Sequence, residues 1–198
     1  MELAHAPATY AFIAVNVIIS VYAFVADPRF FDEFCFHIGA VTRGKQYHRL
    51  ITSAFLHADA MHLAFNMITL FSFGPVVERL LGTDGLIVIY VGSILASKLV
   101  AIYRNRRDFD YTAVGASGAV SGVILSFCLF YPFRDLYFFG LPFGIPAVIF
   151  GVGYMLLSAR LMNNANRVIG HEAHLGGALG GIVLTVLMRP EAVTRWFA

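Results

Sequence analysis

The chain has 198 residues, of which 59% are hydrophobic and only 13% are charged. Soluble domains are closer to half apolar and about a quarter charged, so this composition is typical of a membrane protein. A net charge of +2 is too small to favour nucleic acid as a partner, and two cysteines are too few for a disulfide framework. We therefore expect one integral membrane domain over residues 1–198, surrounded by membrane lipid.

Six segments are apolar and long enough to predict membrane-spanning helices, which need about 20 apolar residues each. They cover approximately residues 9–26, 61–80, 85–103, 115–131, 143–161 and 168–188. The first segment lacks the basic start of a cleavable signal, so we expect it to be retained as a helix. The fifth segment contains Pro146. This order predicts an all-α, multi-pass bundle of six transmembrane helices.

The connection from Asp27 to Ala60 is 34 residues long, whereas the other connections are short. Loops of this length are usually functional or disordered, but this one carries too many apolar side chains for a disordered segment. We expect a structured first loop, partly embedded in the membrane interface, with short amphipathic helices. A loop that packs on the helix ends without a function is the alternative.

The basic residues bear on the orientation in the membrane. With six spans, nine Lys and Arg residues lie on the side of the first loop and four lie on the side of the N-terminus. The positive-inside rule then favours an N-terminus outside the cytoplasm.

Strongly polar side chains at membrane depth are costly, which makes them functional candidates. Here they gather near the starts of three predicted helices, all on the side of the long first loop, so one shared pocket is geometrically possible. The three groups are His57, His62 and Asn66; Ser117 and Ser121; and His171, Glu172 and His174.

Ser117 lies in the stretch Gly115-Ala116-Ser117-Gly118 at the start of the fourth predicted helix. A serine there is close to free backbone N–H groups and to the positive end of the helix dipole. This environment suits a nucleophile whose reaction forms an oxyanion. Small residues also let neighbouring helices approach closely, so a packing surface without catalysis is the alternative.

On the sixth predicted helix, one stripe is formed by Gly170, His174, Gly177 and Gly181. A histidine on a glycine stripe faces another backbone at close range, and the slim fourth helix is the available partner. We therefore expect His174 and Ser117 to be neighbours. Neutral histidine can take the proton of a serine hydroxyl near pH 7, which predicts acyl-transfer chemistry.

His62 and Asn66 are four residues apart, so they share one face of the second predicted helix. With the backbone N–H of Ser117 they could donate hydrogen bonds to an oxyanion. Interhelical hydrogen bonds that only hold the bundle together are the alternative. Glu172 is two residues from His174 and is expected to point away from it, so it does not complete a triad.

With these residues in this order, the chain resembles the rhomboid family of intramembrane serine proteases over nearly its whole length. The family's Gly-x-Ser-Gly motif is similar to residues 115–118, its Ala-His-x-x-Gly motif to residues 173–177, and its His-x-x-x-Asn motif to residues 62–66. His57 lies five residues before the His-x-x-x-Asn motif, as in many members.

The resemblance implies a catalytic dyad, with Ser117 as nucleophile and His174 as general base. It implies oxyanion stabilisation by His62, Asn66 and the Ser117 backbone, and neither a cofactor nor a metal is expected. The implied substrates are single-span or other transmembrane proteins, which enter laterally near the fifth helix.

The resemblance also implies a six-helix rhomboid bundle in a bacterial inner membrane, with the active site opening to the extracytoplasmic side. It puts the N-terminus in the cytoplasm, against the charge count. No oligomeric state follows from the sequence.

Two positions depart from the family's pattern. Many relatives have Trp-Arg in the first loop; here it reads His48-Arg49, so Arg49 matches as a structural residue of that loop and the tryptophan is absent. Well-known relatives carry a tyrosine four residues after the nucleophile, stacked on the catalytic histidine. That position is Ser121 here, so the ring of His174 needs other packing, or a hydroxyl, to hold it.

Two other classes of protein fit the same polar residues. A membrane zinc hydrolase would use His57, His62, His171, Glu172 and His174, because zinc takes histidine and carboxylate ligands. The run His171-Glu172-Ala173-His174 lacks the spacing of His-Glu-x-x-His, however. A non-proteolytic transporter or binding protein would use the polar groups as a relay or as a site for a partner helix.

Overall fold

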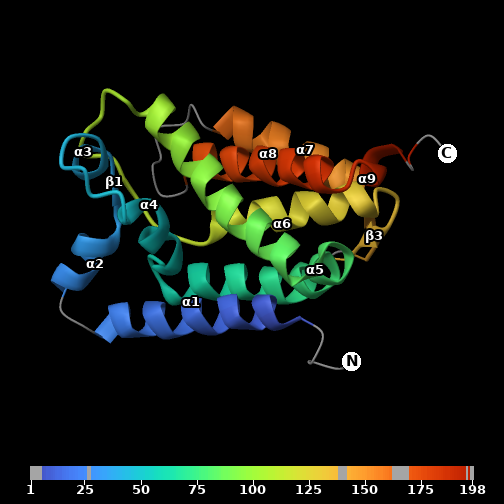
Figure 1. Ribbon diagram of the computed structural model, residues 1–198, viewed down its shortest axis with the longest axis horizontal. Helices are drawn as coiled ribbons and strands as arrows, with labels where there is room; N and C mark the ends of the chain where they lie inside the picture. Colours follow the sequence, from blue (N-terminus) through green and yellow to red (C-terminus); the bar gives the residue numbers. More distant parts are fainter. Residues whose placement is uncertain (1–5, 26–27, 138–141, 162–169, 195, 197–198) are drawn as a thin grey trace.

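Long apolar helices make up most of the chain, as Figure 1 shows. The computed structural model describes residues 6–25, 28–137, 142–161, 170–194 and 196. Its long helices are α1 (Pro7–Val25), α5 (Ala60–Arg104), α6 (Ser117–Phe130), α7 (Ala147–Leu161) and α8 (His171–Met188). The short helices are α2 (Pro28–Phe34), α3 (Ile38–Thr42), α4 (Arg49–Thr52), η2 (Ser53–Phe55) and α9 (Glu191–Thr194). Two antiparallel pairs join β1 (Phe36–His37) to β2 (Thr112–Ala113) and β3 (Asp135–Leu136) to β4 (Ile145–Pro146).

The long helix α5 is broken at Gly82, where φ is 80° and ψ is 167°. A positive φ of this size favours glycine, which has no side chain to clash with the backbone. The break divides α5 into two rods that correspond to the predicted helices at 61–80 and 85–103. In Figure 1 the second rod turns back across the bundle toward the end where the first rod begins.

Helix α6 forms the centre of the bundle. Every residue from Gly118 to Cys128 is buried, and α6 packs against both α5 and α8. Helices α1 and α7 lie on the outside, α1 against α5 and α7 against α8 and α6. Their outward side chains are large and apolar, among them Ile18 and Val25 of α1 and Ile149 and Leu156 of α7. Exposed apolar surface of this kind is typical of a protein that faces lipid.

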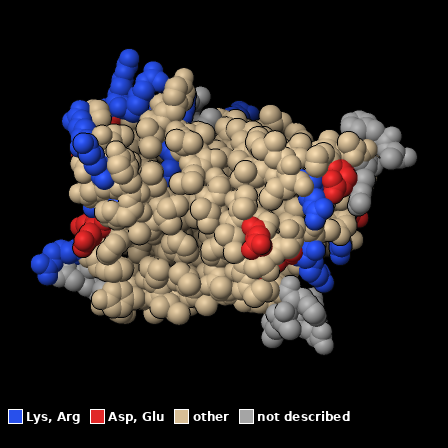
Figure 2. All heavy atoms as spheres, viewed as in Figure 1, with Lys and Arg blue, Asp and Glu red and all other residues tan. Residues whose placement is uncertain are grey.

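The charged residues lie toward the two ends of the molecule. Figure 2 shows most Lys, Arg, Asp and Glu there, with a broad band of other residues between them that is interrupted on this face by acidic atoms near its middle. By length and composition, α1 and α5 could each cross a membrane, and α6 and α7 are shorter apolar helices. Within the described residues, two helices therefore meet both the length and the apolar composition expected of a span, and α5 contains two of the six predicted segments.

Three predicted boundaries differ from the structure. The fourth helix begins at Ser117 instead of Gly115, because Gly115 has a φ of 115° that no helical residue adopts. The fifth begins at Ala147, and Pro146, which we predicted inside it, ends β4; a proline has no N–H for a helix interior. The sixth begins at His171, and the predicted start at 168 lies outside the described residues.

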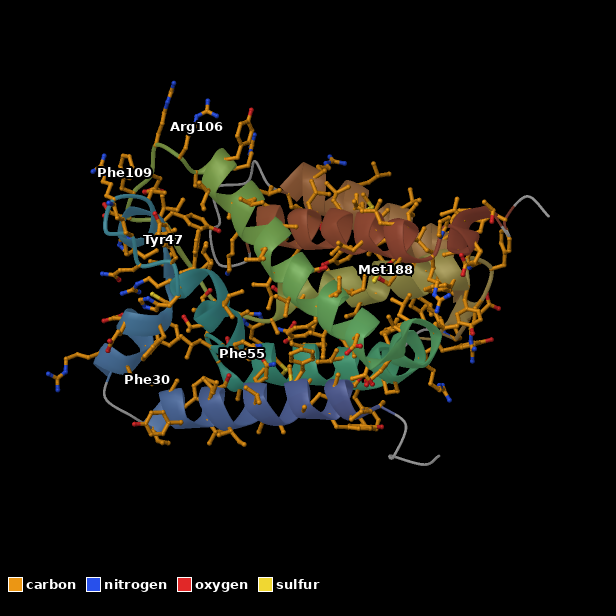
Figure 3. All side chains as sticks on the ribbon, viewed as in Figure 1. Phe30, Tyr47, Phe55, Arg106, Phe109 and Met188 are labelled. Atoms are coloured by element: carbon orange, nitrogen blue, oxygen red, sulfur yellow. The ribbon has the colours of Figure 1, made fainter. Side chains whose placement is uncertain are left out.

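The first loop is structured and contains short helices, as the sequence predicted. It gathers at one end of the bundle together with the segment that follows α5. Figure 3 labels Phe30 and Tyr47 of the loop at the same end as Arg106 and Phe109, whereas Met188 lies toward the opposite end. The loop therefore covers the end of the bundle at which α6 and α8 begin.

Arg49 cross-links the first loop internally. Its side chain is only 8% exposed, and its guanidinium donates to the Gln46 side chain at 2.6 Å and to the carbonyls of Asp32 and Cys35 at 2.6 and 2.9 Å. A planar guanidinium can make several such bonds at once. These contacts join the end of α2 to the start of α4.

Helix α1 is fastened to α5 by the buried carboxylate of Glu78. It accepts hydrogen bonds from the N–H groups of Ala8 and Thr9, both at 2.9 Å, and from the hydroxyls of Thr9 and Thr83 at 2.7 and 3.0 Å. The first N–H groups of a helix have no partner within it. Glu78 therefore caps the start of another helix, a role that the sequence alone did not indicate.

Candidate active site

The start of α6 presents Ser117 as the first residue of the helix, after a sharp turn at Gly115. The first intrahelical hydrogen bond runs from the N–H of Val120 to the carbonyl of Ala116 at 2.9 Å. The N–H groups before Val120 in the first turn, including that of Ser117, have no acceptor within the helix. They point out of its N-terminal end. The predicted environment of Ser117 is therefore present.

The backbone just before Ser117 is held by the fully buried ring of His57. Its Nε2 accepts the N–H of Ala116 at 3.4 Å, and its Nδ1 lies 2.8 Å from the hydroxyl of Ser20. That hydroxyl donates in turn to the carbonyl of Phe55 at 2.9 Å. Because Nε2 accepts, the proton of the neutral ring must lie on Nδ1 and be donated to Ser20.

His57 is also kept neutral by its surroundings. Burial and the nearby ring of His62 lower the pKa of His57 to about 3, against the opposing effect of Asp59. A neutral ring can donate on one nitrogen and accept on the other, which is what its two hydrogen bonds require.

His62 and Asn66 lie on the first turns of α5, next to the start of α6. A Cβ added to Gly115 would lie 2.5 Å from Cε1 and 2.8 Å from Nε2 of His62, so this imidazole packs directly on the turn before Ser117. Its ring meets that of His57 edge to face, with centroids 5.0 Å apart. The buried amide of Asn66 donates to the carbonyl of His62 at 2.9 Å and has a second N–H to donate.

Helices α6 and α8 meet backbone to backbone. A Cβ added to Gly177 would collide with the backbone of Gly118, and one added to Gly181 would collide with the backbone of Gly122. The predicted contact between the glycine stripe and the slim α6 is thus confirmed at these two levels.

This contact brings the segments that carry Ser117 and His174 together. Ser117 directly precedes Gly118, and a Cβ on Gly118 would lie 3.4 Å from the carbonyl of Ala173, the residue before His174. Among the side-chain hydrogen bonds of the described residues, none joins the Ser117 hydroxyl to the His174 ring. Catalytic hydrogen bonds are often long or poorly aligned in the absence of substrate.

The ring of His174 is bordered by two other rings. Tyr154 of α7 lies parallel to it, with centroids 6.2 Å apart and an interplanar angle of 20°, and His171 meets it edge to face at 5.9 Å. The Tyr154 hydroxyl lies 2.5 Å from that of Ser121, which donates to the carbonyl of Ser117 at 2.6 Å. Sequence reasoning missed Tyr154, because nothing near it in the sequence indicates which residue of another helix its ring would meet.

The sequence also missed Lys98, which is buried in the second rod of α5 with its ammonium 4.9 Å from the centroid of the Phe36 ring. The sequence did contain a signal for Lys98, because a charged residue within an apolar predicted helix is a functional candidate by default. Lys98 contacts the first loop through Phe36.

Glu172 is turned toward the end of α5, where its Oε1 accepts from the side chain of Asn105 at 3.0 Å. It therefore points away from His174, as expected. Across the ranges that the structure describes, no three His, Cys, Asp or Glu side chains are grouped so that they could hold a metal ion. The zinc alternative has no ligand set in that part of the chain.

These features define a helical membrane protein with a serine, histidines and an asparagine gathered at one end of its bundle. The rhomboid domain family matches residues 44–191, which is most of the chain. The Bacillus subtilis protein named "Putative rhomboid protease YdcA" is 33% identical over 151 residues, covering 76% of this chain and 72% of that protein. The chain therefore belongs to the rhomboid family and is an integral membrane serine protease of the intramembrane type.

Mitochondrial relatives are similar over a comparable share of the chain. "RHOMBOID-like protein 12, mitochondrial" of Arabidopsis thaliana is 32% identical over 147 residues, and "Rhomboid protein 1, mitochondrial" of Saccharomyces cerevisiae is 28% identical over 166 residues. The matches cover 66% and 75% of this chain. This chain spans 43% and 46% of the length of these two relatives, so each has long regions without a counterpart in the match.

Proposed function

We propose that this chain hydrolyses peptide bonds in or near the transmembrane segments of membrane-protein substrates, with Ser117 as nucleophile and His174 as general base. The observation that carries the proposal is the backbone contact between Gly118 and Gly177, which aligns the starts of α6 and α8. A hydroxyl and an imidazole on neighbouring helix starts are what acyl transfer to a serine requires.

In the first step the Ser117 oxygen attacks the carbonyl carbon of the scissile bond while His174 takes the hydroxyl proton. The carbonyl electron pair moves to its oxygen, and the resulting oxyanion accepts hydrogen bonds from the Ser117 N–H, Asn66 and His62. Each such donor typically contributes about 3 kcal/mol in the transition state. His174 then gives its proton to the leaving amine as the C–N bond breaks. Water attacks the acyl-enzyme, with His174 again as base, and Ser117 is regenerated.

The substrate must present an extended segment to this site. A peptide bond within a transmembrane helix is hydrogen-bonded internally and shielded by side chains, so the helix has to unwind locally before Ser117 can reach it. Helix ends and helices with weak local propensity are therefore the expected cleavage regions.

We further propose a topology of six spans, formed by α1, the two rods of α5, α6, α7 and α8, in a bacterial inner membrane. The end that carries the first loop and the starts of α6 and α8 would face the extracytoplasmic side, as the family's usual topology implies. The excess of basic residues at that end favours the opposite orientation, and the mitochondrial relatives make an organelle membrane the alternative location.

Cysteine labelling in intact cells tests the orientation, because the two native cysteines, Cys35 and Cys128, are both buried. Tyr47 in the first loop and Phe133 after α6 are 60% and 74% exposed. With a membrane-impermeant thiol reagent, Tyr47→Cys should be labelled from outside and Phe133→Cys only after lysis. The reverse pattern would support the orientation that the charge count favours.

The chemistry is tested by cleavage of a model transmembrane substrate in detergent or vesicles. Ser117→Ala and His174→Ala should each abolish cleavage, whereas Ser126→Ala should not, since Ser126 is buried on the same helix and bonds to Thr185 instead. Cleavage that survives in Ser117→Ala, or that a chelator abolishes, would overturn the proposed dyad. Substrate flux across vesicles without any cleavage would favour a transporter.

A further inference from the structure

The imidazole of His174 lies in a helix that begins only three residues earlier, at His171. A general base must keep its ring at a fixed angle to the serine hydroxyl, because misplacement by about 1 Å can cost about 100-fold in rate. The carboxylate that orients a histidine in a catalytic triad is not available here, since Glu172 is bonded to Asn105. Another group must restrict the ring.

Tyr154 lies where it can restrict the ring of His174. Its ring lies nearly parallel to that of His174, with a 20° angle between the planes. His171 approaches the same imidazole at 87°, so the two neighbours limit its rotation in different directions. Phe150, one turn earlier on α7, stacks with Tyr154 at 6.0 Å between ring centroids and 23° between the planes.

The Tyr154 hydroxyl is itself fixed by α6. Ser121 donates its proton to the carbonyl of Ser117 at 2.6 Å, so the Tyr154 hydroxyl must be the donor in its 2.5 Å contact with Ser121. A continuous chain of hydroxyls therefore runs from Tyr154 through Ser121 to the backbone of Ser117. The same tyrosine therefore lies beside the ring of the candidate base and is linked through this chain to the backbone of the candidate nucleophile.

We propose that Tyr154 is a positioning residue for the His174–Ser117 pair, and that it supplies from α7 the ring that well-known relatives supply from the position of Ser121. This inference rests on the proposed dyad and adds to it a third helix that has to be in place for catalysis. Ser121 contributes as the hydroxyl that anchors the tyrosine.

The test compares variants that remove the ring with variants that remove only the hydroxyl chain. Tyr154→Leu loses both, and it should lower kcat for a model transmembrane substrate by about 10- to 100-fold with KM nearly unchanged. The rate of labelling of Ser117 by a fluorophosphonate should fall in parallel, since that reaction needs no bound substrate. Adding Ser121→Tyr to Tyr154→Leu returns a ring from α6 and should restore part of the rate. Ile18→Ala, on the exposed face of α1, is the control for loss of a large apolar side chain and should react as the wild type does.

The chain of hydroxyls from Tyr154 through Ser121 to Ser117 is tested with separate variants, so that the test of the positioning role does not depend on whether Tyr154→Leu folds. Tyr154→Phe and Ser121→Ala each keep the ring and should slow labelling by roughly three- to tenfold, the effect of one neutral hydrogen bond. The double variant should be no slower than either single variant, because all three break the same chain. Wild-type rates in both single variants, or losses that add, would overturn the inference.

Different results would reject the positioning role of Tyr154 and the Ser117–His174 dyad. If Ser117→Ala is inactive while Tyr154→Leu is folded and reacts at the wild-type rate, the positioning role is wrong and the dyad stands. If Ser117→Ala retains cleavage and labelling, the dyad itself is wrong.

Discussion

Gly177 of α8 lies directly against the backbone of Gly118 of α6, so close that a methyl group on Gly177 would collide with the Gly118 carbonyl. Because His174 and Ser117 are carried on these two helices, next to this contact, any separation of α8 from α6 also separates the proposed base from the proposed nucleophile.

The first prediction follows from that contact. Gly177→Ala should push the helices apart, lower the free energy of unfolding by about 1–3 kcal/mol, as overpacking typically does, and strongly reduce cleavage. Gly153→Ala is the matched control, because a Cβ on Gly153 meets nothing within 4 Å, and it should be neutral or slightly stabilising in its helix. Thermal denaturation and a cleavage assay on both variants check this; equal behaviour would show that the close approach is not needed.

The second prediction concerns the oxyanion. Asn66→Ala removes a buried amide that has one N–H left to donate, and it should lower kcat by roughly 100- to 1,000-fold with little change in KM. Thr69→Ala is the control, since Thr69 lies one turn further along α5 and bonds only to the carbonyl of Phe65 in its own helix. A KM effect without a kcat effect in Asn66→Ala would assign Asn66 to substrate binding instead.

The third prediction concerns the fastening of α1. Glu78→Ala leaves the N–H groups of Ala8 and Thr9 buried without their acceptor, which should lower the free energy of unfolding by about 3 kcal/mol. Glu33→Ala, an exposed carboxylate on α2, should change it by no more than about 0.5 kcal/mol. Denaturation in mild detergent compares the two, and similar small losses would argue against the cap.

The fourth prediction concerns pH. The folded protein holds His57 neutral with a pKa of about 3, whereas an unfolded histidine titrates near 6.5. Below about pH 6.5 the unfolded chain therefore binds a proton that the folded chain does not, and stability falls as the pH falls. This ring contributes a slope of about 1.4 kcal/mol per pH unit.

The variant His57→Asn keeps a polar side chain at this position but cannot titrate. Its free energy of unfolding should be lower than that of the wild type at pH 7 and should fall less steeply between pH 6.5 and 4. Parallel curves for the two proteins would mean that His57 is not held neutral.

The sequence predicted the helices well, because each is an apolar run bounded by charges, glycine or proline. It also predicted the facing glycines, since a stripe of small residues on the last helix needs an equally slim partner. Gly170 is the exception in that stripe: a Cβ there would meet the hydroxyl of Tyr111, at 3.3 Å, rather than α6. It lies before the first residue of α8, where helical spacing no longer applies.

The parts that could not be predicted depend on contacts between distant segments. Nothing local to Tyr154 indicates that its ring would lie on His174, and nothing local to Glu78 indicates that it would cap α1. Such pairs are fixed by how the helices pack, which the periodicity of one sequence does not specify. The start of α6 at Ser117 was missed by two residues, because the sequence does not show that Gly115 adopts a positive φ, with which the helix cannot begin there.

The most direct test of the central claim is to identify the residue that a fluorophosphonate modifies. The purified protein should be labelled with one adduct per chain, and mass spectrometry of its peptides should locate the adduct on Ser117. His174→Ala should react far more slowly, because the hydroxyl then has no base. An adduct on another serine, or labelling of His174→Ala at the wild-type rate, would contradict the account.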